Sequence, residues 1–217
     1  MNDTAPGDRS TPHPAPETNH AHHKKKREGY RGILTAIAII ASAVIVAFCL
    51  RSFVFQPYLV DGASMETTLQ NNNWLIVNKI PRTWSKITGH AYIPGRTEIV
   101  IFSENEGFAL GSSGEKQLIK RIIGLPGERV VVKDGILTVY NKDQPDGFQP
   151  DKTYPYGKAI TTTPGNIDVT VGTDEVFVCG DNRNNSLDSR TFGPIPAKHI
   201  VGKLSLRIFP LNKMQDF

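Results

Sequence analysis

Two histidines, His90 and His199, are the only ones beyond the first 23 residues of this 217-residue chain. A Ser-His-Asp hydrolase needs a histidine as its base, but neither histidine lies beside a distinctive serine motif. Two histidines without a cluster of Cys or Glu also make a weak metal site. A histidine-dependent hydrolase that uses His90 or His199 therefore stays an alternative, and lysine is the other side chain to consider as a base.

Lys120 lies in the apolar run 118–123. A lysine acts as a general base once burial lowers its pKa toward neutrality. In a β-strand Leu118, Lys120 and Ile122 point to the same face, so the amine would have the apolar neighbours that its neutral form requires. Taken alone, the pattern also fits a lysine on an exposed edge strand.

Ser64 is the candidate nucleophile, within the segment 60–65. Gly62 permits a tight turn and the close approach of a substrate chain. A backbone amide near Ser64 can then face a tetrahedral oxyanion. The same residues also fit an ordinary Gly-Ala-Ser turn.

A third segment, 180–190, follows the apolar strand predicted at 175–179 and reads GDNRNNSLDSR. It concentrates hydrogen-bonding groups and opposite charges directly after a buried element. Such a segment is either a solvated loop or a buttress beside an active site.

An uncharged apolar run, 33–50, precedes all three segments. As a helix it is about 27 Å long, enough for the hydrocarbon core of a bilayer. Basic residues gather before the run and only Arg51 follows it closely, which places the N-terminus in the cytoplasm. The run lacks the polar face of a soluble helix and ends in a poor cleavage site, so we expect an uncleaved transmembrane anchor over residues 30–50.

The remaining parts of the chain differ in composition. Residues 1–29 are rich in proline and poor in large apolar groups, which predicts a disordered cytoplasmic tail. Residues 51–217 carry short β-branched runs separated by turn residues, which predicts a mainly β extracytoplasmic domain of curled antiparallel sheets with a barrel-like core. Within it, the polar stretch 141–173 is predicted to be a peripheral excursion, and 133–136 to be a tight hairpin. The predicted strands are 74–79, 98–103, 117–123, 129–133, 136–140, 175–179 and 200–208.

Composition excludes several classes of function. The net charge of +4, from 25 Lys+Arg and 21 Asp+Glu, is too small an excess to imply nucleic-acid binding. Two cysteines exclude a disulfide-dense scaffold and a four-Cys zinc site. Cys49 and Cys179 are not expected to pair, and Cys179 is expected to be a buried strand residue.

Taken together, the three segments resemble the motifs of bacterial type I signal peptidases, the membrane-anchored serine proteases that remove signal peptides from exported proteins. The segment 62–69 is similar to the nucleophile box, 120–128 to the lysine box and 180–190 to the third box, with 98–102 similar to a strand box between the first two. The resemblance spans about residues 30–208. Three boxes in family order behind an N-terminal anchor outweigh the local alternatives.

The resemblance implies a serine endopeptidase that cleaves signal peptides from exported preproteins by acyl transfer. Ser64 would be the nucleophile and Lys120 the general base. Ser186 would orient the Lys120 amine, and the Ser64 amide, in the loop that contains Gly62, would donate to the oxyanion. An ion-pair scaffold behind the dyad would be formed by Asp188, Arg190, Arg121 and Asp181. The resemblance implies no cofactor and no metal.

Several positions depart from the family pattern. Thr67 stands where many members have Pro, which suggests a looser loop without loss of catalysis. Gly62 stands where many members have a hydroxyl that donates to the oxyanion. Arg96-Thr97-Glu98 replaces the usual Arg-Gly-Asp, which affects a turn. The short excursion 141–173 suggests the smaller, Gram-positive-like layout.

The resemblance also implies partners and a location. The partners would be signal peptides, membrane lipid and a nearby secretion translocon, at the cell membrane, with a single span and an extracytoplasmic catalytic domain. The alternative from another class is a membrane-tethered β-domain that binds peptides or envelope partners without cleaving them. The joint presence of Ser64, Lys120 and Ser186 favours the peptidase.

Overall fold

The structure is a computed structural model that describes residues 20–89, 91–104 and 116–217. The chain divides into two units, Met1–Ala47 and Phe48–Phe217. Most of the predicted cytoplasmic tail, residues 1–19, lies outside the described residues. The remainder of that tail belongs to helix α1, which begins at His20.

Helix α1, His20–Cys49, contains the predicted anchor and leads into the π-helical turn η1, Leu50–Val54. The stretch Gly32–Val54 has a mean hydropathy of 2.8 and none of its most apolar window is buried against protein. Among the described residues it is the one helical stretch long and apolar enough to cross a membrane. It coincides with the apolar run from which the anchor was predicted.

The C-terminal unit is mainly β and antiparallel, which confirms the predicted fold class. Its larger sheet has the strand order β1-β2-β10-β3-β4-β8-β9, and β11 pairs with β10. The strands are β1 Phe55–Leu59, β2 Trp74–Asn78, β3 Ile99–Glu104, β4 Lys116–Gly124, β8 Glu175–Cys179, β9 Ile195–Pro196, β10 Ile200–Phe209 and β11 Gln215–Asp216.

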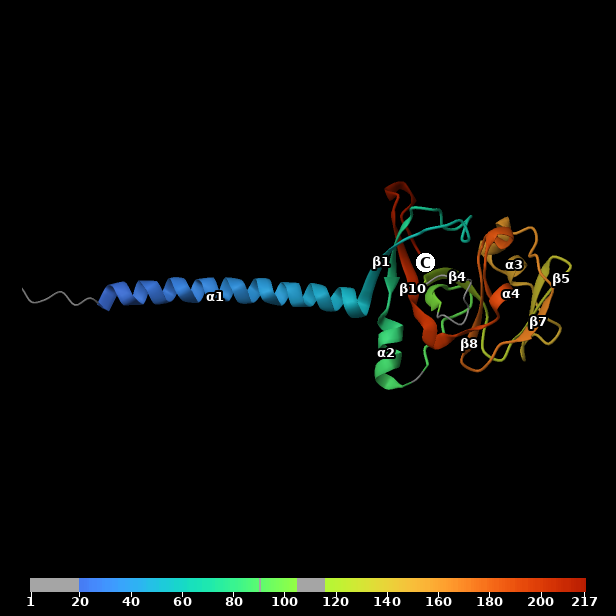
Figure 1. Cartoon of the computed structure of the whole chain (residues 1–217), viewed down its shortest axis with the longest axis horizontal. Helices are drawn as coiled ribbons and strands as arrows, with labels where there is room; N and C mark the ends of the chain where they lie inside the picture. The colour runs from blue at the N-terminus through green and yellow to red at the C-terminus, as the bar shows by residue number, and fades with distance from the viewer. Residues whose placement is uncertain (1–19, 90, 105–115) are drawn as a thin grey trace, which may run out of the picture. The chain divides into compact units, whose positions relative to one another are not determined.

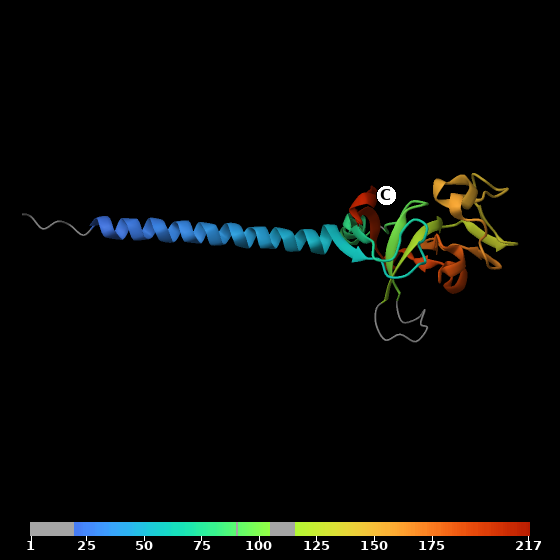
Figure 2. The ribbon, with the colours of Figure 1, turned by 90° about the horizontal axis from the view of Figure 1, so that it is seen from above.

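A second, three-stranded sheet has the order β6-β5-β7, with β5 Arg129–Lys133, β6 Ile136–Tyr140 and β7 Ile167–Thr170. Within the C-terminal unit it lies at the opposite end from β1 in both views (Figures 1 and 2). The turn between β5 and β6 has positive φ at Asp134 and Gly135, 51° and 78°, as the tight hairpin predicted from the sequence requires. All seven predicted strands are present, with ends within one residue of the prediction.

The stretch 141–173 is more closely integrated than the predicted peripheral excursion. It contains α3 Pro150–Thr153, the 3-10 turn η3 Pro155–Ala159 and β7. Strand β7 pairs with β5, placing Val169 opposite Val130. Tyr156 packs against the hydrophobic core between the two sheets. The strand is only four residues long, too short for its alternation to stand out from the polar residues around it.

Apolar side chains from both sheets form a common core. Ile123 of β4 and Phe177 of β8 pack against Val130 and Val132 of β5. Cys179, at the end of β8, is fully buried in this cluster, as predicted, and both cysteines are free thiols. Burial raises the pKa of the Cys179 thiol. The core therefore fixes β4 between its neighbours, and β4 is the strand that carries Lys120.

The C-terminal unit also contains helix α2, Ile80–Thr88, which was not among the predicted elements. Strand β2 ends at Asn78, one residue earlier than predicted, because Lys79 starts this helix. Four shorter helical segments lie in the chain after β8: η4 Arg183–Asn185, α4 Ser189–Phe192, η5 Ala197–His199 and η6 Leu211–Lys213.

Candidate active site

Strand β4 places Lys120 inside the larger sheet, with β3 on one side and β8 on the other. Val100 of β3 lies opposite Lys120, and the lysine is only 2% exposed. The edge-strand interpretation of Lys120 is therefore wrong. An amine in this position has lost most of its hydration.

The Lys120 amine lies next to the Ser64 hydroxyl. Nζ of Lys120 donates a hydrogen bond to Oγ of Ser64 over 2.7 Å, and another to the Ile119 carbonyl over 3.1 Å. The two side chains are 56 residues apart in sequence. The structure thus brings together the serine and lysine that the sequence predicted, within the distance that direct proton transfer requires.

Ser64 begins a turn, residues 64–68, in the connection between β1 and β2. Met65 and Leu69 are 1% and 0% exposed and belong to a hydrophobic cluster that includes Leu75 of β2. These buried side chains hold the turn onto the sheet. Gly62 precedes it with φ of +105°, a conformation that side chains rarely adopt.

The third segment holds the turn 64–68, which we call the nucleophile turn after the predicted role of Ser64, from the other side. The Asn182 amide donates to the Ser64 carbonyl over 3.0 Å, and Nδ2 of Asn182 donates to the Ala63 carbonyl over 3.1 Å. Among the described residues the Ser64 amide itself donates no hydrogen bond, so it is available to an oxyanion. Asn182 was not among the predicted site residues, although it lies inside the predicted third box.

Three buried ion pairs surround this arrangement. Arg121 makes a bidentate contact with Asp181, with Nε–Oδ1 at 2.8 Å and Nη2–Oδ2 at 2.6 Å. Arg190 Nε lies 2.8 Å from Asp188 Oδ1. These are the four residues predicted as a scaffold. A third pair was not predicted: Arg183 lies 2.5 Å from Asp151, which belongs to the stretch 141–173.

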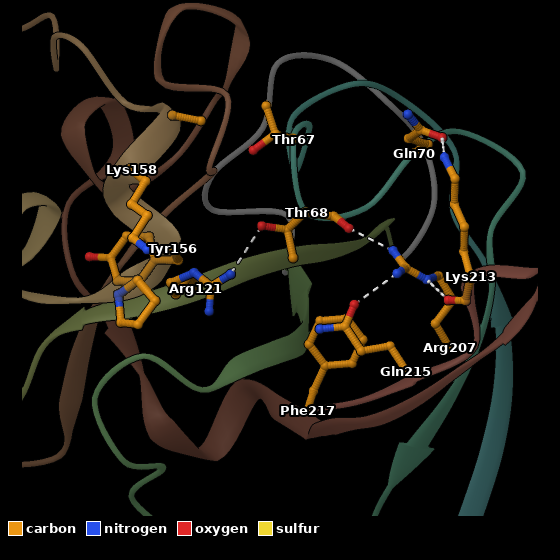
Figure 3. A pocket seen from close by; sticks show the side chains of 12 residues that line it. Thr67, Thr68, Gln70, Arg121, Tyr156, Lys158, Arg207, Lys213, Gln215 and Phe217 are labelled. Atoms are coloured by element: carbon orange, nitrogen blue, oxygen red, sulfur yellow. Dashed lines mark hydrogen bonds between the residues drawn. The ribbon is translucent and has the colours of Figure 1, made fainter.

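A cavity of about 560 Å³ lies behind the nucleophile turn (Figure 3). Arg121 lines this cavity and Lys120 lines the one around Ser64, because successive residues of β4 point to opposite faces. Nη1 of Arg207 donates to the Thr68 carbonyl over 2.8 Å, and Nη2 of Arg121 donates to Oγ1 of Thr68 over 3.3 Å. Two arginines therefore hold the turn from behind.

Gly180 lies between the nucleophile turn and Ser186. A Cβ at position 180 would come within 2.3 Å of both the Ser64 carbonyl oxygen and the Ser186 Oγ. Oγ of Ser186 is buried and has no hydrogen-bond partner among the described residues. The Lys120 amine donates to Ser64 and to the Ile119 carbonyl, and its hydrogen bond with Ser186 stays a prediction.

The side chains of Ser64 and Lys120 line a cleft of about 440 Å³. Its walls come from β1 and the segment after it, from β2, β3 and β4, and from the third segment. The lining residues are Tyr58, Leu59, Val60, Asp61, Gly62, Ala63, Ser64, Leu75, Ile101, Gln117, Leu118, Ile119, Lys120, Asn185 and Leu187. A groove of this kind, with a nucleophile on its wall, suits an extended peptide.

Of the two histidines predicted as alternative bases, only His199 is among the described residues, and it does not join this site. His90 lies outside the described residues. His199 lies in η5 and does not line the cleft around Ser64. Partial burial and the positive charges of Lys198 and Arg82 lower its pKa. Among the described residues, no group of three His, Cys, Asp or Glu side chains could hold a metal ion.

The ionised Asp188 carboxyl makes the stability of the protein depend on pH. Burial alone would raise the pKa of its carboxyl, but the hydrogen bonds and charge of Arg190 and the Gly180 amide hold that pKa below its ordinary value of 3.8. The pKa of Asp188 is therefore lower in the folded than in the unfolded protein. The ionised carboxyl stabilises the fold at pH values above the unfolded-state pKa, and this stabilisation is lost as the pH falls through the folded-state pKa. We therefore expect the unfolding free energy to fall less steeply in acid for Asp188→Asn than for the wild type.

Urea unfolding in detergent over the acid range measures this difference. Asp143→Asn, at an exposed position, is the control and should show the wild-type dependence. Equal acid sensitivity of Asp188→Asn and the wild type would count against a stabilising role for the ionised Asp188.

Comparisons with known proteins identify the family of this chain. The model of the family "Signal peptidase, peptidase S26" matches residues 33–209. Signal peptidase I T of Bacillus subtilis is 35% identical over 197 residues, which cover 89% of this chain and 92% of that protein. Signal peptidase I V of the same organism is 39% identical over 169 residues, 75% of this chain and 91% of that protein. A crystal structure of a signal peptidase I from Enterococcus faecalis matches at 25% identity and a TM-score of 0.39, covering 52% of this chain and 97% of that one.

Proposed function

The chain belongs to the signal peptidase family S26 and is a serine endopeptidase that cleaves signal peptides, and we propose that Ser64 is its nucleophile and Lys120 its general base. The observation that carries this assignment is the 2.7 Å contact between Lys120 Nζ and Ser64 Oγ. It lies on the wall of a peptide-sized cleft, and the amine that makes it is almost completely buried.

Lys120 acts first as a base and then as an acid. In its neutral form the amine accepts the Ser64 proton while Oγ attacks the scissile carbonyl carbon and forms a tetrahedral intermediate. Collapse of the intermediate breaks the peptide bond, and the Lys120 ammonium returns the proton to the departing amine. Water then attacks the Ser64 ester with Lys120 again as base, releasing the signal peptide and restoring the serine.

The intermediate carries a negative oxygen that needs hydrogen-bond donors. The Ser64 amide is the donor we assign, because no described residue accepts from it and the Asn182 contacts fix the peptide groups around it. Gly62 has no side-chain donor to add, so the backbone supplies this stabilisation.

The supporting residues act by holding position. Arg121, Asp181, Asp188 and Arg190 fix the backbones of β4 and of the third segment. Ser186 is the proposed partner for the Lys120 amine during turnover. Its hydroxyl is buried, and a buried polar group gains by acquiring hydrogen-bond partners.

Among the described residues, one helical stretch is long and apolar enough to cross a membrane. We propose that Gly32–Val54 spans the cell membrane once, with the N-terminus in the cytoplasm and the β domain outside. The basic residues before the span support this orientation. Membrane lipid and the secretion translocon are its proposed surroundings.

Cleavage of a preprotein in liposomes tests the assignment of the nucleophile. We expect the wild type to release the signal peptide and Ser64→Ala to lose cleavage, because no hydroxyl then remains to attack. Ser103→Ala, on β3 and outside the cleft lining, is the control and should retain activity. Cleavage by Ser64→Ala at the wild-type rate would show that Ser64 is not the nucleophile. An inactive wild type would instead support a peptide-binding domain, an alternative that the comparisons do not favour.

A further inference from the structure

Helix α2 has its apolar side chains on the outside. No residue of the helix is buried, and Ile80, Trp84 and Ile87 are 47%, 65% and 72% exposed. At 100° per residue these three positions fall within one narrow stripe. The helix therefore presents a continuous apolar stripe that the described part of the chain leaves uncovered.

Several polar side chains of α2 contact the rest of the domain instead. Oγ1 of Thr83 donates to the Phe53 carbonyl over 3.0 Å, and Oγ of Ser85 accepts from the Tyr92 amide over 3.1 Å. Arg82, Ser85 and Lys86 line a cavity of about 600 Å³ that is also bounded by residues next to β8 and β9. A surface helix of a soluble protein has the opposite arrangement, with its apolar stripe on the core.

The N-terminal end of α2 is fixed to the end of the apolar span. The Lys79 amide, directly before the helix, donates to the Val54 carbonyl over 2.7 Å. Val54 is the last residue of the stretch that can cross the membrane. Phe53, whose carbonyl accepts from Thr83, is itself 54% exposed. The apolar stripe thus lies beside the residues at which the chain leaves the hydrocarbon.

We propose that α2 is an interfacial helix whose stripe of Ile80, Trp84 and Ile87 lies in the headgroup region of the phospholipid bilayer. Trp favours this zone because its ring is apolar and its N–H is polar. Short amphipathic helices bury their apolar face at the boundary between headgroups and acyl chains. Such a contact fixes the catalytic domain to the membrane at a second point. The inference rests on the membrane anchor and is independent of the catalytic roles of Ser64 and Lys120.

Fluorescence of the full-length protein in vesicles tests this placement. The chain has two tryptophans, so Trp74→Phe leaves Trp84 as the only emitter. We expect Trp84 emission to be quenched when the vesicle lipids carry bromine on their acyl chains, and to be protected from aqueous acrylamide. The matched control carries Trp74→Phe, Trp84→Phe and Lys142→Trp, which moves the emitter to an exposed position beyond β6. Emission from this control should be quenched by acrylamide and should not respond to brominated lipid.

A second variant tests whether the quenching of Trp84 depends on the other apolar residues of the stripe. Ile80→Ser and Ile87→Ser, in the Trp74→Phe background, remove two exposed side chains and no buried contact, so the fold should persist. We expect bromine quenching to fall and acrylamide quenching to rise. If Trp84 in the parent is as open to acrylamide as the Lys142→Trp control and insensitive to brominated lipid, α2 faces water and the proposal is wrong.

Discussion

Replacement of Lys120 by methionine is expected to lower kcat for preprotein cleavage by about 10²–10⁴-fold, the usual contribution of a general base. Methionine matches the length of lysine and suits the apolar neighbours of a residue that is 2% exposed. It has no nitrogen to accept the Ser64 proton. Because the substitution leaves no cavity and no unpaired charge, the unfolding free energy should not fall. Cleavage kinetics and urea unfolding of the same preparation separate the two effects.

Lys133→Met is the matched control, since Lys133 is exposed at the end of β5 and should be replaceable without effect. The pH profile adds an independent test. The wild-type rate should rise with pH as the Lys120 amine loses its proton, and the residual rate of Lys120→Met should lack this rise. A Lys120→Met enzyme with the wild-type kcat would show that another group is the base.

Gly180→Ala is expected to lower kcat by about 10²-fold, because a displacement of about 1 Å at reacting atoms has an effect of that size. The new Cβ would lie 2.3 Å from the Ser64 carbonyl oxygen and from Ser186 Oγ. A serine side chain can rotate away, but a backbone carbonyl held by the Asn182 amide cannot move without its turn. The nucleophile would therefore shift relative to Lys120 Nζ.

Gly95→Ala is the control for a glycine substitution as such, because a Cβ there makes only ordinary contacts with the Glu98 side chain, 3.7 Å or more away. If Gly180→Ala lowers kcat by a larger factor than it changes KM, the defect lies in the chemical step. Wild-type kinetics for Gly180→Ala would mean that the turn is not held as tightly as the contacts indicate.

Much of the fold could be predicted because its strands follow simple patterns. Strand β4 alternates Leu118, Lys120 and Ile122 with Ile119, Arg121 and Ile123, and this alternation places Lys120 toward Ser64 and Arg121 toward Asp181. The β5–β6 hairpin follows from Asp134-Gly135, which accept positive φ. Both patterns depend on neighbours in sequence, so the sequence alone reveals them.

Features that depend on distant contacts could not be predicted in this way. Helix α2 escaped detection because it is only nine residues long, and its three apolar residues are too few to establish a helical period. Asn182 holds the Ser64 turn across 118 residues of chain, and Arg183 pairs with Asp151 inside a stretch expected to be peripheral. Local propensity contains no information on such pairings. The concentration of polar and charged groups in the third segment, and its resemblance to a known box, drew attention to that region without showing these contacts.

The most direct test of the account is to identify the residue that carries the acyl group. Wild-type enzyme is mixed with preprotein, quenched in acid within the first turnover, digested and analysed by mass spectrometry. We predict an ester between the signal peptide and Ser64, absent from Ser64→Ala and greatly reduced in Lys120→Met. An adduct on another residue, or rapid cleavage by Ser64→Ala without any adduct, would contradict the Ser64–Lys120 mechanism.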